Sequence, residues 1–224
     1  MKKIVSVLFL LTAITMQGKA QTDLQVHYDF GKNRKYITTT VESFKADKWG
    51  SEFFFVDIDH DPSDYRSPSG AYTEISRSLN FWGGPVSAHI EYDGGLGLGY
   101  GINSAWLVGA DYFMHSKDFS KTLTLQGMFK NIRGKNNTAQ LTAVWGTQWL
   151  NKKVTFSGFA DLWWEKNTYE YVTNTIHPVF LTEPQIWYNF TEHMSAGSEV
   201  EISTNFGGNE GLMVNPTLAL KWIF

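Results

Sequence analysis

The chain has 224 residues, of which 16% are aromatic, and a formal net charge of −3 at pH 7. It contains no cysteine, which excludes disulfide frameworks and thiolate metal sites. The acidic balance argues against nucleic acid as a partner. The aromatic content, with nine Trp, is high for a soluble domain.

The first twenty residues have the pattern of a secretory signal peptide. Lys2 and Lys3 precede an apolar run from Ile4 to Ile14, and Gly18-Lys19-Ala20 places small residues three and one before a cleavage point after Ala20. The run is shorter than the ~20 residues that a spanning helix needs, which disfavours a permanent anchor. We expect an exported chain of one domain, residues 21–224. The loss of three lysines changes its formal charge from −3 to about −6.

Alternation of apolar and polar residues with a period of two runs through almost all of residues 21–224, with almost no helical periodicity. In Val86–Asp93, for example, V, A, I and Y alternate with S, H, E and D. Twelve such segments near the length of a tilted spanning strand, with no helical segment between them, predict an all-β fold, a transmembrane antiparallel β-barrel. The expected strands are Leu24–Gly31, Arg34–Ala46, Ser51–His60, Ala71–Trp82, Val86–Asp93, Ile102–His115, Phe119–Asn131, Thr138–Leu150, Val154–Glu165, Pro178–Phe190, Met194–Phe206 and Leu212–Phe224.

The connections between these segments alternate between short turns and generally longer linkers. This alternation predicts an outer-membrane barrel with short periplasmic turns, longer extracellular loops and both termini on the periplasmic side. The expected turns are Asp47–Gly50, Gly83–Pro85, Ser116–Asp118, Asn151–Lys153 and Thr191–His193. The expected loops are a short one near Lys32-Asn33 and longer ones at Asp61–Gly70, Gly94–Gly101, Ile132–Asn137, Lys166–His177 and Gly207–Gly211.

Aromatic residues gather near both ends of the predicted strands, as expected where amphipathic rings lie at the two membrane interfaces. The predicted periplasmic belt comprises Trp49, Phe81, Trp82, Tyr112, Trp149, Tyr188, Trp222 and Phe224. The opposite belt comprises Tyr28, Phe30, Tyr92, Trp164 and Phe206.

The chain ends in "LMVNPTLALKWIF", whose apolar parity includes the final residue, Phe224. A last strand that closes against the first leaves no edge, so no polar tail is required. A terminal Phe also resembles the signal that outer-membrane proteins present to the barrel assembly machinery. Pro216 lacks an amide donor, so we expect a local bulge or a missing hydrogen bond there.

The inward parity of the predicted barrel is mostly acidic, with Lys130 and Lys221 as its clear basic residues. Such an interior disfavours anions and admits neutral or cationic solutes, although a merely solvated wall is the simpler interpretation for most of these groups. Arg77 has outward parity, which indicates either a bulge or a wrong phase in its strand. The inward titratable residues are His27, Asp29, Glu42, Asp57, Asp59, Glu74, His89, Glu91, Asp93, Asp111, Asp161, Glu165, Glu183, Glu199 and Glu201.

Aromatic residues also have inward parity, among charged neighbours. They could stack against a planar solute, which contributes ~1–3 kcal/mol per stacked ring, or they could simply fill the interior of a barrel of intermediate width. These residues are Phe44, Phe53, Phe55, Tyr72, Phe159, Trp163 and Trp187.

The segment "YITTTVESFKADKWGSEFFFVDID", Tyr36 to Asp59, resembles the second and third strands of the nucleoside-specific channel-forming (Tsx-like) outer-membrane family. "GGPVSAHIEYDGG" and "TEPQIWYNF" are similar to later strands of that family. The resemblance implies a monomeric twelve-stranded channel for nucleosides, surrounded by outer-membrane lipid. It assigns substrate contacts to Glu42, Phe44, Phe53, Phe55 and Asp57. The inward residues Glu74, Asp111, Asp161, Glu183 and Trp187 complete the substrate site that we predict. No catalytic residue, metal or cofactor is expected.

Two other functions remain open. A barrel enzyme of the lipase type would need Ser and His near the outer leaflet, but the adjacent pair His115-Ser116 falls at a periplasmic turn. An enzyme of the protease type would need paired acids and a His above the rim; the residue types occur at Asp57, Asp59, His60, Asp61 and Asp64. A non-conducting barrel could instead bind a partner through "NTYEYVTNTIHP", residues 167–178.

Overall fold

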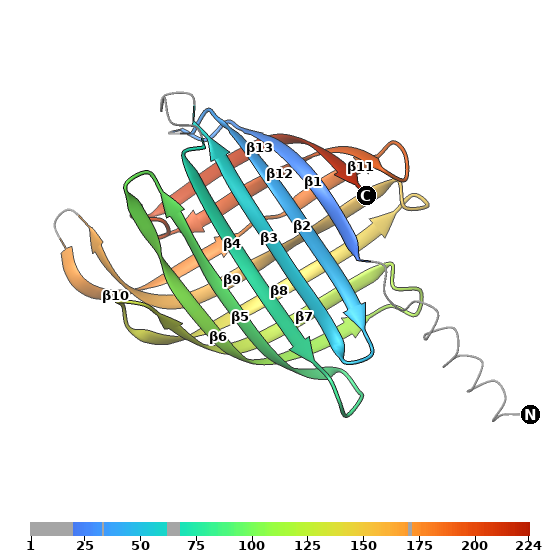
Figure 1. Cartoon of the computed structure of the whole chain (residues 1–224), viewed down its shortest axis with the longest axis horizontal. Coiled ribbons are helices and arrows are strands. Elements are labelled where there is room, and N and C mark those ends of the chain that lie inside the picture. Colours follow the sequence, from blue (N-terminus) through green and yellow to red (C-terminus); the bar gives the residue numbers. More distant parts are fainter. Residues whose placement is uncertain (1–19, 33, 62–67, 170–171) are drawn as a thin grey trace, which may run out of the picture.

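The computed structural model describes residues 20–32, 34–61, 68–169 and 172–224, and their regular structure is entirely β (Figure 1). No helix among these residues is long and apolar enough to cross a membrane. The expected signal peptide lies, except for Ala20, outside the described residues. The strands are β1 (Gln21–Asp29), β2 (Ile37–Asp47), β3 (Gly50–His60), β4 (Gly70–Leu79), β5 (Val86–Gly97), β6 (Tyr100–His115), β7 (Lys121–Ile132), β8 (Asn137–Trp149), β9 (Val154–Tyr169), β10 (Val172–Thr182), β11 (Gln185–Asn189), β12 (Met194–Thr204) and β13 (Leu212–Ile223).

The strands form a closed antiparallel barrel, as predicted. Neighbouring strands pair in sequence, and β13 pairs with both β12 and β1, so the sheet has no free edge. β10 and β11 are two parts of one barrel strand, because both pair with β9 and β12. They are separated at Glu183-Pro184, where proline has no amide to donate to the ladder. The barrel therefore has twelve strands, tilted as Figure 1 shows.

The two ends of the barrel are called here the near end and the far end. The near end carries the start of β1 and the C-terminus, where the amide of Phe224 donates to the carbonyl of Thr22 at 3.0 Å. It also carries the β2–β3 turn, because Phe44, close to that turn, pairs with Gln21. The near end is the end predicted to be periplasmic. The far end carries the remaining set of connections, including the β5–β6 turn.

Two far-end linkers were wrongly predicted, because most of their residues belong to strands. The expected linker Gly94–Gly101 continues β5 and β6 to a two-residue turn, and Lys166–His177 continues β9 and β10. Three glycines of the first linker, Gly94, Gly95 and Gly97, lie where a backbone or a ring approaches closely. A Cβ on Gly95 would lie 2.3 Å from the carbonyl oxygen of Ala71. Close approach within a strand, and not a loop, therefore accounts for this glycine.

The outer surface carries both aromatic belts, with one exception. All eight residues of the near-end belt are exposed large aromatics, and Tyr28, Phe30 and Trp164 are exposed toward the far end. Phe206 was wrongly placed in the far belt. It lies in the β12–β13 loop and packs edge-on against the inward ring of Trp163, with ring centroids 5.9 Å apart. The loop turns it inward, which strand parity does not predict.

Arg77 faces outward, as its parity indicates, and the expected bulge or phase error is absent, so that expectation was wrong. It pairs with Glu52 on one side and Ile90 on the other in an unbroken register. Its guanidinium donates to Asp47 at 2.8 Å and lies 3.8 Å from Glu52, which is itself 3.5 Å from Lys45. Alternating charges on neighbouring strands thus allow an arginine on the outer surface near the β2–β3 turn.

The expected defect at Pro216 is present as an interruption of the β12–β13 ladder. Pairing continues from Gly197–Ala219 to Val200–Pro216 in the same register, so there is no bulge, but the two intervening pairs are missing. The side chain of Thr217 replaces them: its hydroxyl accepts from the amide of Glu199 and donates to the carbonyl of Glu199, both at 3.1 Å. The missing hydrogen bond was correctly predicted.

Candidate functional site in the barrel interior

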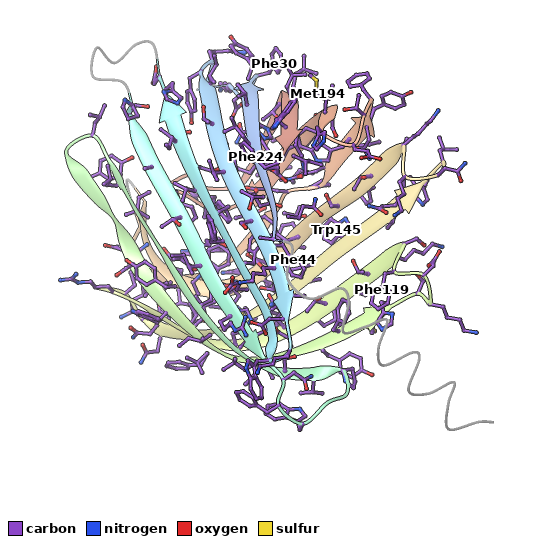
Figure 2. The ribbon with its side chains drawn as sticks, turned by 45° about the vertical axis from the view of Figure 1, so that its right-hand side comes forward. Phe30, Phe44, Phe119, Trp145, Met194 and Phe224 are labelled. Carbon is purple, nitrogen blue, oxygen red and sulfur yellow. The ribbon has the colours of Figure 1, made fainter. Side chains whose placement is uncertain are left out.

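Figure 2 shows the side chains along the barrel strands, and the interior that they surround has two chemically different sides. One side, named here the apolar cluster, comes from β6, β7, β9 and β10, and Phe159 and Phe206 pack against it. Leu107 at its centre is 0% exposed. This packing resembles a protein core and not the wall of a wide pore. The cluster consists of Ala105, Leu107, Met128, Ile132, Trp163, Val179 and Leu181.

The other side, named here the acidic side, carries carboxylates on β2 to β5 and on the β10–β12 region. Glu183, between β10 and β11, interacts electrostatically with Asp57 on β3 and Glu74 on β4, which lie nearly opposite it around the barrel. It interacts also with Glu199 and Glu201 on β12. Carboxylates on strands that face each other across the barrel are therefore close enough to repel each other, which indicates a narrow interior.

A strip of aromatic rings runs along the acidic side on β2, β3 and β4. Phe44, near the β2–β3 turn, is 49% exposed and pairs with Phe53. The ring centroids of Phe53 and Phe55 are 6.1 Å apart, and those of Phe55 and Tyr72 are 6.0 Å apart. The structure thus brings three of the predicted contacts into one row with Tyr72. This row, Phe44, Phe53, Phe55 and Tyr72, is called the aromatic strip below.

The predicted carboxylates differ in how firmly neighbouring donors hold them. Asp111 accepts from Ser78, from His89 at 3.1 Å and from Gln126 at 3.1 Å, so its oxygens are committed to the wall. Among the other predicted acids, Asp57 accepts from Thr40, Asp161 from Thr142 and Glu74 from Tyr72 at 3.0 Å. Glu42 pairs with Phe55 across β2 and β3.

The indole ring of Trp187 points into the barrel and is covered by neighbouring side chains, so neither of its faces is accessible to a solute. It is 1% exposed, Nζ of Lys221 lies 4.0 Å from its ring centroid, and His27 contacts it edge-on with centroids 6.0 Å apart. Trp163 is similar, because Nζ of Lys130 lies 4.4 Å from its ring centroid. Lys130 and Lys221, the two basic residues predicted to face inward, thus lie against tryptophans, where a cation is attracted by the ring face.

A pocket of about 340 Å³ lies at the far end, beside the top of the aromatic strip. Tyr36, Asp59, Tyr72 and Tyr100 are among its lining residues. Burial, together with the charge of Asp59, raises the pKa of Tyr36 to about 12, so this phenol stays neutral and can donate or accept hydrogen bonds. Neither tyrosine was predicted as a site residue: Tyr36 was placed in the strand Arg34–Ala46 without a role, and Tyr100 was placed in the linker Gly94–Gly101.

Arg34 was also missed as an interior residue. Its guanidinium lies 3.2 Å from Asp29 on β1 and 2.6 Å from Glu201 on β12. Both carboxylates are almost fully buried, so the arginine offsets charge at the far end of the acidic side. Arg34 was predicted as the first residue of the strand Arg34–Ala46, whereas β2 begins at Ile37, and only the closed barrel brings its side chain to two different strands.

The residues considered for catalysis do not form a catalytic arrangement among the described residues. His115 Nδ1 contacts the carbonyl oxygen of Ser116 at 2.8 Å, while the Ser116 hydroxyl donates to Asp118 at 2.6 Å. That donation, with Ser120, lowers the pKa of Asp118 to about 2. His60 lies on the outward parity of β3, beside Thr39. Asp64 lies outside the described residues, as do Asn33 and residues 170–171 of the expected 167–178 loop.

Comparison with known proteins assigns the chain to a family. The model of the family described as "Domain of unknown function (DUF5020)" matches residues 20–224. The chain belongs to this family. No curated protein matches the chain in sequence.

Solved structures similar to this DUF5020 member are outer-membrane barrels. The NanC porin superposes with a TM-score of 0.60 at 10% identity, covering 90% of this chain and 98% of that one. A chain from work on the in-meso crystallization of membrane proteins gives a TM-score of 0.50 at 8% identity, with 91% and 83% covered. An OmpT outer-membrane protein of Vibrio cholerae gives 0.45 at 9% identity, with 92% and 98% covered, which is too low to support a conclusion. At these identities the likeness shows the fold alone.

Proposed function

We propose that this DUF5020 protein is an outer-membrane channel through which small neutral or cationic solutes enter the cell. The observation that carries the proposal is the acidic side of the interior, on which carboxylates and the aromatic strip run together along β2, β3 and β4. The porin-type fold, the two aromatic belts and the expected signal peptide support the location. We expect no catalytic activity.

The charge of the interior sets the class of solute. Glu42, Asp57, Glu74 and Glu183 lie on the acidic side, whereas Lys130 and Lys221 lie against tryptophan rings. A ring of carboxylates attracts cations and opposes anions in a narrow interior. The solute is therefore expected to carry no net negative charge.

The aromatic strip narrows the proposal to planar solutes, of which nucleosides are the first candidates. The rings of Phe53 and Phe55 on β3 and of Tyr72 on β4 offer neighbouring stacking surfaces. Stacking of a base on one such ring contributes ~1–3 kcal/mol of binding free energy. The resemblance of Tyr36–Asp59 to the Tsx-like family points to the same class. Nucleotides, which carry phosphate, should be excluded by the acidic side.

Conductance of the purified protein in a planar bilayer tests the channel. We expect cation-selective current that nucleosides reduce and that nucleoside monophosphates leave unchanged. Asp57→Asn should lower the cation selectivity, while Glu52→Gln, an acid of the same strand that faces outward, should not. Current with anion selectivity would contradict the proposal.

Neighbouring phenylalanines on β3 provide a matched test of the aromatic strip. Phe55→Ala should weaken the block by nucleosides, because the ring faces the interior. Phe54→Ala should leave the block unchanged, because Phe54 has the opposite parity and is an exposed residue of the outer surface. Equal effects of the two substitutions would refute stacking on the strip.

A second candidate function, a non-conducting barrel that serves the envelope structurally, is favoured by the apolar cluster. Seven buried apolar residues inside a twelve-stranded barrel fill part of its cross-section. If the folded protein inserts into bilayers and passes no current under any condition, this function replaces the channel.

A further inference from the structure

We infer that the barrel interior contains a binding site for a hard divalent cation of the Ca²⁺ type, formed by Glu74 on β4 and by Glu91 and Asp93 on β5. One oxygen from each carboxylate lies within 4.8 Å of the other two. Ca²⁺ binds oxygens at 2.3–2.6 Å, so two of its ligands are at most about 5 Å apart. The three oxygens therefore fit around one ion. The inference does not depend on which solute the barrel passes.

The backbone places these three carboxylates together. Glu74 pairs directly with Asp93 across β4 and β5, and Glu91 lies two positions from Asp93 on the same face of β5. Two of the side chains are oriented by donors: the hydroxyl of Tyr72 donates to Glu74 Oε1 at 3.0 Å, and His89 Nε2 contacts Glu91 Oε2 at 3.1 Å. Each of the two has a second oxygen that accepts no hydrogen bond from a residue that the structure describes.

Asp93 provides the observation that points to a ligand. Its side chain is buried, the whole residue being 5% exposed, and Oδ1 has no hydrogen-bond partner among the described residues. Its other oxygen, Oδ2, faces Nζ of Lys130 at 3.6 Å. A buried carboxylate oxygen without a partner is unfavourable. A cation bound between Asp93, Glu74 and Glu91 would supply that partner.

The surrounding charges leave this cluster negative. Asp161 on β9 interacts electrostatically with Glu74 and Asp93, so it contributes a further negative charge to the surroundings of the cluster. Lys130 is the nearby cation, but its ammonium also donates to Gln140 at 2.7 Å and lies over the ring of Trp163. His89 is shared between Glu91 and Asp111.

The donor set favours Ca²⁺ among divalent cations. All three ligands are carboxylates, which suit Ca²⁺, Mg²⁺ and Mn²⁺ and not the softer ions that prefer imidazole or thiolate. Ca²⁺ tolerates irregular arrangements of six to eight oxygens, whereas Mg²⁺ demands near-octahedral geometry at shorter distances. Three side chains on two adjacent strands approach the ion from one side, which leaves room for water or solute oxygens. Binding would reduce the negative charge beside Tyr72 of the aromatic strip.

The site is tested by isothermal titration calorimetry. The full-length protein is refolded in detergent, freed of bound metals and then titrated with Ca²⁺. We expect one saturable site per chain. Asp93→Asn and Glu91→Gln should weaken it at least about tenfold, while Glu52→Gln, an outward-facing acid on β3, should not. Lys130→Met should tighten it, because the ammonium competes for Asp93. Heat-dependent gel mobility verifies that each variant is folded.

Two results would overturn the site. One is the absence of saturable Ca²⁺ binding to the folded wild-type protein. The other is undiminished binding to a folded variant that combines Glu74→Gln, Glu91→Gln and Asp93→Asn, which would place the ion elsewhere. Because binding is measured without any current, failure of the channel proposal and failure of the cation site are distinguished.

Discussion

The two sides of the barrel interior are built from the same strand geometry and behave oppositely. The apolar cluster around Leu107 buries hydrocarbon and packs it closely, which stabilises the fold. The acidic side gathers carboxylates around Glu183 and Asp93 with few cations, which opposes folding. Groups that cost stability and are nevertheless concentrated in one region are typical of functional sites. The contrast therefore places the packed core on β6, β7, β9 and β10 and is consistent with the solute site that we propose on β2 to β5.

The largest effect is expected in the apolar cluster. Leu107→Ala should lower the free energy of unfolding by about 2–5 kcal/mol, because it leaves a cavity among fully buried side chains. Denaturant unfolding in detergent micelles measures this change. Val108→Ala is the matched control, since Val108 is 54% exposed on the outer surface. Equal losses for the two variants would mean that the cluster is not a packed core.

An intermediate effect is expected at Arg34, whose positive charge compensates two buried carboxylates of the acidic side. Arg34→Ala should lower the free energy of unfolding by roughly 2 kcal/mol, because it leaves Asp29 and Glu201 buried without their cation; one-third exposure of Arg34 reduces the effect. The same unfolding measurement applies, with Lys32→Ala, an exposed residue of the same loop, as control. An unchanged free energy would show that the two carboxylates need no arginine.

The smallest effect should have the opposite sign. Glu183→Gln should raise the free energy of unfolding by on the order of 1 kcal/mol, because it removes one member of a repelling group. Repulsion with Glu199, Glu201, Asp57 and Glu74 grows as carboxyls ionise, so the gain should be larger at pH 8.5 than at pH 5.

Unfolding at both pH values checks this prediction, and Glu192→Gln in an exposed near-end turn is its control. A loss of stability at both pH values would contradict the contrast between the two sides of the interior.

Much of the barrel could be predicted because side chains alternate along a strand with a period of exactly two. That regularity assigned Phe53, Phe55 and Asp57 to the interior, and it placed Arg77 outside even though an outward arginine was unexpected. Gly94–Gly101 was wrongly predicted as a linker, because glycines within β5 interrupt the apolar–polar alternation where neighbouring groups approach closely. Phe206 escaped prediction because loop conformation has no period.

By itself, the sequence determined the strand number, the inward face of most strands, the acidic interior, the near-end aromatic belt and the weak ladder at Pro216, because these follow from local pattern. Only the tertiary structure decided which interior residues meet. Closure of the barrel and its strand register bring Leu107 near Val179, Arg34 to Glu201, and Glu74 to Asp93. The first two contacts join strands far apart in the chain, and the third depends on the register of a hairpin; no local pattern encodes either.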